Sequence, residues 1–324
     1  MIVVMRCVLV ALAVVACSHD HRAPSVAQTT PDPWDVVASP DDPPDFASVH
    51  ALAEKACPRV KAPYFYRVER AGAVSYFLGT RHIGVPLAKF PDVVSREIHA
   101  AKLVVFETPP DDDSDSSDGH GVDGKTSLAD QLGPELWARY RKLVGSDTAD
   151  ALEHARPSAA MIMLIALYED KLAMLDVEIE RVVQEAHIKT MGLESHAFQE
   201  RLIEELMDVR MLRATVSGTP DRAALQRESA DDLAEYCAGS DEQPGSDPDT
   251  RKDLRAGGYS DADIDAIDDK LVFARNRDWI PKLEPLLAKG GVVVVVGADH
   301  LIGSRGVIAL LAARGWKTTR VTRP

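Results

Sequence analysis

The chain has 324 residues, which is enough for one large domain or two small ones. Its hydrophobic content of 45% and charged content of 27% are those of a globular protein, and they exclude collagen-like, coiled-coil and wholly disordered classes. The formal net charge of −14 would repel a phosphate backbone, so no nucleic-acid partner is expected.

The first 17 residues predict a signal peptide rather than part of the fold. Arg6 precedes an apolar run at residues 7–16, which is too short to span a membrane as a mature helix. Residues 14–17, Val-Val-Ala-Cys, resemble the lipobox of bacterial lipoproteins. That resemblance implies lipid on Cys17 and a membrane anchor in the bacterial cell envelope, with the following serine favouring the outer membrane, facing the periplasm. The alternative is a plain secretory signal with Cys17 near the cut by chance.

Residues 18–45 are rich in Pro and Asp and show no periodicity, so they predict a disordered tether before a folded domain at 46–324. Two cysteines remain in that domain, Cys57 and Cys237. Disulfides persist in exported proteins, so a Cys57–Cys237 bridge is expected, with two unpaired thiols as the alternative.

Strands and helices alternate along the folded part, which predicts an α/β fold with a central β-sheet flanked by helices. Aromatic and β-branched runs at 64–68 and 74–78 predict a hairpin. A mainly helical insertion, roughly residues 125–285, separates two strand-rich ends. The other expected strands are 103–106, 190–194, 292–296 and 317–322, and the other expected helices are 86–101, one opening at Ser127, one starting at Pro157, 262–289 and 303–315.

An acidic stretch at residues 111–118 carries five Asp in eight positions. It lacks the central glycine and the terminal glutamate of an EF-hand loop, so it predicts a solvated loop rather than a calcium site. The stretch follows Glu107 closely and has the character of an insertion.

Four polar side chains follow the ends of predicted strands. His82 and His300 each lie three residues after a strand-ending glycine, and Glu107 and Glu194 end two other strands. Ligands of open α/β sheets bind at the carboxyl ends of the strands, so we expect these side chains to converge. Such a set suits a divalent metal that activates water, with His82, Glu107 and His300 as ligands. It equally suits metal-free acid/base catalysis in which a carboxylate orients an imidazole. A single strand-end histidine could also be a capping residue.

Five segments of the chain resemble the TraB/GumN/Tiki group, in the order of that family and over roughly residues 60–322. Two of them, 76–84 and 296–303, carry the glycine–histidine motifs, and the others are 103–107, 190–194 and 273–277. The resemblance implies an α/β fold with active-site groups at the strand ends. It assigns the motif histidines to His82 and His300, the paired acid to Glu107, the later Leu-Glu to Glu194, and an Arg-Asn pair to Arg275 and Asn276.

The animal Tiki branch of this group is described as metal-dependent proteases that act on a secreted signalling protein. The resemblance therefore implies a membrane-tethered, peptidase-like hydrolase with a divalent metal ion and a peptide or protein substrate. In this hypothesis Arg275 stabilises an oxyanion or grips a substrate carboxylate. The alternative is a non-catalytic envelope lipoprotein that binds a metal or small ligand, or that scaffolds a complex.

Overall fold

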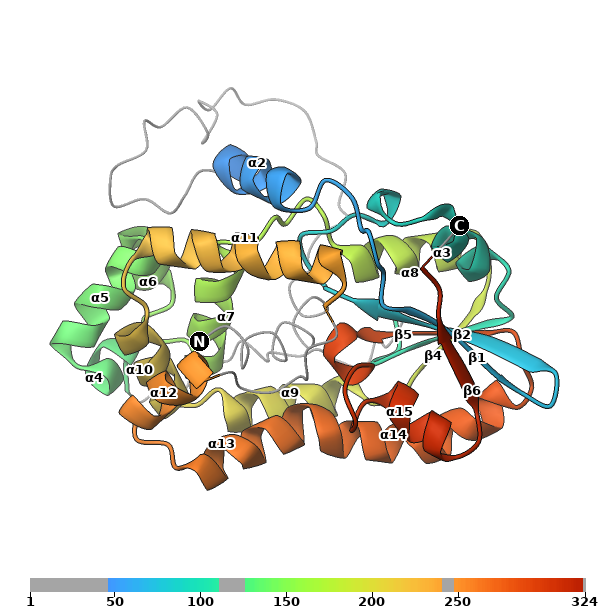
Figure 1. Ribbon diagram of the computed structural model, residues 1–324. Helices are drawn as coiled ribbons and strands as arrows, with labels where there is room; N and C mark the ends of the chain where they lie inside the picture. Colours follow the sequence, from blue (N-terminus) through green and yellow to red (C-terminus); the bar gives the residue numbers. More distant parts are fainter. Residues whose placement is uncertain (1–45, 111–125, 241–247, 323–324) are drawn as a thin grey trace.

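The computed structural model describes residues 46–110, 126–240 and 248–322. The expected signal peptide (1–17), tether (18–45) and acidic loop (111–118) lie outside these residues. The described chain contains a six-stranded sheet in the order β4-β3-β5-β2-β1-β6 (Figure 1). Its strands are β1 (Phe65–Arg70), β2 (Ala73–Thr80), β3 (Leu103–Phe106), β4 (Lys189–Gly192), β5 (Val292–Gly297) and β6 (Lys317–Arg320). The predicted α/β fold and the predicted hairpin, β1–β2, are confirmed.

The four strands that precede the candidate residues are parallel to one another. β5 lies between β2 and β3, and β4 pairs with β3 on the far side. β5 is buried along its whole length, which suits its run of five valines, since β-branched side chains pack well in a strand covered on both faces. Thr80 of β2 pairs with Gly297 of β5, so these strands end at the same edge of the sheet.

The helices form two groups. Around the sheet lie α3 (Asp92–His99), α8 (Leu175–Glu185), α14 (Ala274–Leu287) and α15 (Val307–Ala313), whereas α2 (Phe46–Ala56) lies beside the helix Arg222–Ala238 (Figure 1). The insertion contains α4 (Leu128–Leu132), α5 (Pro134–Val144), α6 (Ser146–Ala151), α7 (Pro157–Ala166), α9 (His196–Leu206), α10 (Val209–Gly218), α11 (Arg222–Ala238), α12 (Pro248–Ala256) and α13 (Asp261–Asp268). Each group has its own hydrophobic cluster, and the insertion extends to one side of the sheet (Figure 1).

Two expected helices are shorter than predicted. Over 86–101, a 3₁₀ turn at Leu87–Lys89 comes first and α3 begins only at Asp92, because Pro91 holds the residue before it in extended backbone. Over 303–315, α15 begins at Val307, since Gly303 adopts a left-handed φ of 75° that breaks the helix there. The expected starts at Ser127 and Pro157 are confirmed, and the Ser127 side chain caps α4 by accepting from the Asp130 N–H.

A disulfide bond joins Cys57, just after α2, to Cys237 in the last turn of α11, as the cysteine count predicted. The bond closes a loop with a sequence separation of 180 residues. It therefore holds the first described helix against the insertion.

Replacing both cysteines by serine should lower the free energy of unfolding by about 2–5 kcal/mol, because the unfolded chain regains the freedom that the long closed loop removes. The melting temperature of the oxidised protein, with and without reductant, measures this effect. Reductant should leave the melting temperature of the double variant unchanged. Equal stability of the two proteins under oxidising conditions would contradict the expectation.

Candidate functional site

The carboxyl ends of four strands carry buried polar side chains. His82 lies two residues after β2, Glu107 directly after β3, Glu194 two residues after β4, and His300 in a 3₁₀ turn (Ala298–His300) after β5. Between 1% and 8% of each side chain is exposed. Because these strands are parallel neighbours, the four residues lie along one edge of the sheet, as the motif spacing predicted.

Arg275, in the first turn of α14, joins three of these residues. Its Nε lies 3.0 Å from both carboxylate oxygens of Glu194, and its Nη2 lies 2.6 Å from Oε2 of Glu107. Burial disfavours the charged guanidinium, but the two carboxylates outweigh this and raise the pKa of Arg275. Arg275 is therefore a charged residue inside the protein, neutralised in place by its partners.

The guanidinium of Arg275 has no N–H group left for a substrate. Nη1 donates to the carbonyl oxygen of Leu271 at 3.0 Å and to Nε2 of His300 at 3.1 Å, and Nη2 also donates to Glu194 at 2.8 Å. With the contacts of Nε and Nη2 already described, every N–H of the guanidinium has an acceptor. Binding a substrate carboxylate, the role expected for Arg275, would therefore require the guanidinium to break one of these hydrogen bonds.

Glu107 is fixed through both of its oxygens. Oε1 accepts the backbone N–H of Gly297 at 2.7 Å, and Oε2 accepts Arg275 and, at 3.2 Å, the side-chain amide of Gln199. Burial raises the pKa of Glu107, while the charge of Arg275 and the Gly297 N–H act in the opposite direction. The carboxylate therefore links β3, β5, α9 and α14.

His300 is held at both ring nitrogens. Nδ1 donates to Oδ1 of Asn276 at 2.7 Å, and Nε2 accepts from Arg275. The ring packs against Trp279, with the ring centroids 4.4 Å apart. Burial, the charge of Arg275 and the proximity of His82 lower the pKa of His300 well below its usual range, so the imidazole is neutral.

His82 differs from His300 in one respect. Its Nδ1 donates to the carboxylate of Asp176 in the first turn of α8, but its Nε2 is buried and has no hydrogen-bond partner among the described residues. Burial, followed by the charges of Arg275 and Arg81, lowers the pKa of His82, so this imidazole is also neutral. Of the two motif histidines, only His82 therefore offers a free lone pair.

A model of the TraB/PrgY/gumN family matches residues 64–320. The chain belongs to this family. The match begins just before β1 and ends with β6, so it contains the whole sheet and every candidate residue. This confirms the resemblance found in the motifs. No curated protein and no solved structure matches the chain.

The metal ligands expected for this TraB-family chain do not form a ligand set as they are placed. His300 and Glu107 direct their donor atoms at Arg275, Asn276 and Gly297, and a cation beside them would meet the guanidinium charge. Within the described ranges, no group of three or more His, Cys, Asp or Glu side chains could hold a metal ion. The residues therefore do not fit a resident metal in this arrangement, and metal binding stays a prediction.

Two residues of the site carry no motif and were missed in the sequence. Asp176 contacts His82, and Gln199 donates to Glu107 at 3.2 Å and to Glu194 at 3.3 Å. Asp176 lies in α8, beside the sheet, and Gln199 lies in α9, which belongs to the insertion. The only available signal was an acidic residue in the first turn of a helix, which is common for electrostatic reasons alone.

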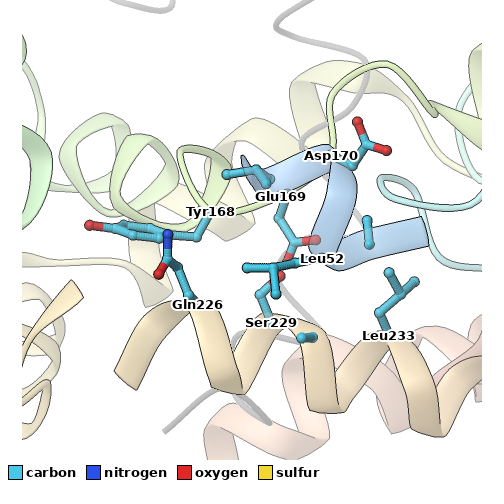
Figure 2. A pocket seen from close by; sticks show the side chains of 10 residues that line it. Leu52, Tyr168, Glu169, Asp170, Gln226, Ser229 and Leu233 are labelled. Carbon is cyan, nitrogen blue, oxygen red and sulfur yellow. The ribbon is translucent and has the colours of Figure 1, made fainter. Parts of the chain in front are cut away.

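A separate small pocket lies between α2, α11 and residues 168–170, which follow α7, and Figure 2 shows the side chains that line it. None of the five predicted site residues lines it. Glu169 in its wall accepts from Arg81 at 2.7 and 2.9 Å, which fixes the residue next to His82. This pocket is therefore a neighbour of the candidate site and not part of it.

The buried neutral histidines predict a loss of stability on acidification. Below a pH of about 6.5 the unfolded chain protonates His82 and His300, while the folded chain, with lowered pKa values, does not. The unfolded state then binds more protons, so the free energy of unfolding should fall by up to ~1.4 kcal/mol per pH unit for each histidine. The free energy of unfolding therefore keeps its full value above a pH of about 6.5 and decreases as the pH falls below it.

Unfolding by urea at several pH values between 7.5 and 5.5 measures this dependence, and His82→Gln provides the comparison. The variant should show a shallower decrease, by the contribution of one histidine. The buried carboxyls with raised pKa values, Glu107 and Glu169, act in the opposite direction and are present in both proteins. Identical pH dependence in the two proteins would show that His82 is not held neutral.

Proposed function

We propose that this chain is a hydrolase in which the neutral imidazole of His82 takes a proton from a water molecule that attacks a carbonyl carbon. The observation that carries the proposal is the bare, buried Nε2 of His82, on a ring whose Nδ1 is held by Asp176. A general base needs a free acceptor within hydrogen-bond reach of the proton it removes. His300 has none, because Arg275 occupies its Nε2.

The surrounding charges suit this reaction. When His82 takes a proton it becomes a cation, and the adjacent carboxylate of Asp176 stabilises that cation. Burial and the charge of Arg275 lower the pKa of His82, which keeps the imidazole neutral and able to accept a proton before the reaction. Because Glu107 and Glu194 neutralise the guanidinium, the proposal gives Arg275 no oxyanion-stabilising role. Glu107 and Glu194 hold the guanidinium in place during this step.

The substrate class proposed is a peptide or protein, and it rests on the resemblance to the Tiki branch. A peptide library incubated with the purified, detergent-solubilised protein tests the proposal. We expect cleavage by the wild type, none by His82→Gln, and cleavage that persists after a chelator. Loss of cleavage with chelator and recovery with a divalent ion would instead support the metal-dependent hydrolase expected from the sequence.

One observation favours the non-catalytic alternative. The Arg275 cluster, defined as Glu107, Glu194, Arg275 and His300, is nearly closed to solvent and its hydrogen bonds are satisfied, as in a purely structural core. In that case the chain would be an envelope lipoprotein that binds a ligand or scaffolds a complex. Wild-type protein that cleaves no peptide at any metal concentration would favour this alternative.

We also propose that lipid on Cys17 anchors the protein to the bacterial cell envelope. The proposal rests on residues 14–17, Val-Val-Ala-Cys. Among the helices of residues 46–110, 126–240 and 248–322, none is long and apolar enough to cross a membrane.

Changing Cys17→Ala should abolish labelling by a radioactive fatty acid and leave either an uncleaved precursor or a product in the soluble fraction. The matched control is Cys7→Ala, which alters the apolar run of the signal but keeps the acylated position. Unchanged membrane fractionation and processing of the Cys17 variant would rule out lipid anchoring at this residue.

A further inference from the structure

The backbone of His82 is attached to the start of α8. The carbonyl oxygen of His82 accepts the N–H of Leu175 at 3.1 Å, and the N–H of Gly84 donates to the carbonyl of Ala173 at 2.7 Å. Between them, Ile83 and Met174 form an antiparallel bridge. These two hydrogen bonds pair segment 82–84 with segment 173–175, and Asp176 follows immediately.

This pairing requires a glycine. Gly84 has a φ of 99°, in the left-handed region that other residues rarely adopt, and a Cβ there would lie 2.9 Å from Nη1 of Arg81. The Arg81 guanidinium is itself held by the carbonyl of Ile83 at 2.6 Å and by Glu169. The connection between β2 and α8 is therefore rigid on both sides, and it sets the distance between His82 and Asp176.

Asp176 is oriented towards the imidazole. An acidic residue in the first turn of a helix commonly interacts with the free N–H groups and the positive end of the helix dipole. Asp176 instead directs Oδ2 at Nδ1 of His82, and the residue is 8% exposed. A carboxylate without a proton can only accept, so it requires the imidazole proton to sit on Nδ1.

We infer that Asp176 is a positioning residue that holds the proton of His82 on Nδ1 and thereby keeps Nε2 bare. The position of the proton on a histidine is set by the hydrogen bond of its other nitrogen, and among the residues the structure describes Asp176 is the one that bonds to the His82 ring. Asn276 does the same for His300, whose bare Nε2 is then used by Arg275. The catalytic consequence of the Asp176 contact rests on the proposed hydrolase function, but the tautomer itself does not.

Nitrogen-15 NMR of the full-length protein, labelled at histidine, measures the tautomer directly. The signals of His82 are identified by their absence in His82→Gln. The wild type should show a protonated Nδ1 and a bare Nε2. In Asp176→Ala and in Asp176→Leu, neither of which offers Nδ1 an acceptor, the proton should move to Nε2 wholly or in part. A His82 ring that keeps its proton on Nδ1 in both variants would overturn the inference.

Activity provides the second readout. For any peptide that the wild type cleaves, Asp176→Asn should lower kcat by about 10²–10⁴-fold and leave KM nearly unchanged. The matched control is Glu185→Gln, an exposed acid on the same helix that pairs with Arg181 and should change neither readout. If the wild type cleaves nothing, the proposed function fails while the NMR spectra still decide the role of Asp176. If Asp176→Ala does not fold, Asp176→Leu, which fills more of the space and also offers no acceptor, supplies the spectrum.

Discussion

Replacing His82 by glutamine should lower hydrolysis by at least about a hundredfold and leave the protein folded. Glutamine has a similar length and can donate to Asp176, but its amide cannot act as a base at neutral pH. The substitution therefore removes the free lone pair with little change in packing. The measurements are kcat on a cleaved peptide and the melting temperature of the same preparation.

His300→Gln is the informative comparison, because the two motif histidines have different surroundings. His300 is 1% exposed, packs on Trp279 and accepts from Arg275, so its replacement should lower stability as well as activity. Full activity in His82→Gln would refute its role as the base, whatever the stability.

Replacing Arg275 by methionine should lower the free energy of unfolding by about 3–5 kcal/mol. The substitution leaves the carboxylates of Glu107 and Glu194 buried without the charge that balances them, and methionine fills most of the space. Urea unfolding at pH 7 measures the loss. Burial already raises the pKa of Glu107, and without Arg275 its protonation becomes easier, so the loss should become smaller at lower pH.

Arg277→Met is the matched control for Arg275, two positions along the same helix. Arg277 pairs with Asp269 at 2.9 Å on the exposed surface, where ion pairs contribute at most about 1 kcal/mol. Adding Glu107→Gln and Glu194→Gln to Arg275→Met should recover part of the lost stability, because neutral amides replace unpaired charges. If the Arg275 and Arg277 substitutions lowered the free energy of unfolding equally, the charge of Arg275 would not be what stabilises the buried carboxylates of Glu107 and Glu194.

Local sequence patterns were enough to predict the class of fold, the positions of the strands and the polar residues at the strand ends. β5 is a run of valines closed by Gly297, and the hairpin strands β1 and β2 are aromatic and β-branched, so local preference and burial agree. Parallel strands that end together bring His82, Glu107 and His300 to one edge of the sheet. The starts of α3 at Asp92 and of α15 at Val307 were missed, because apolar spacing alone does not mark where a helix begins.

The different surroundings of the side chains at that edge could not be predicted from local patterns, because they depend on how distant elements pack. The two glycine–histidine motifs are alike in sequence, yet Arg275 occupies Nε2 of one histidine and Nε2 of the other is bare. Asp176 and Gln199 have no motif, because they reach the site through the packing of α8 and α9. Hydrogen-bond partners depend on distances between elements far apart in the chain, and local sequence patterns do not contain those distances.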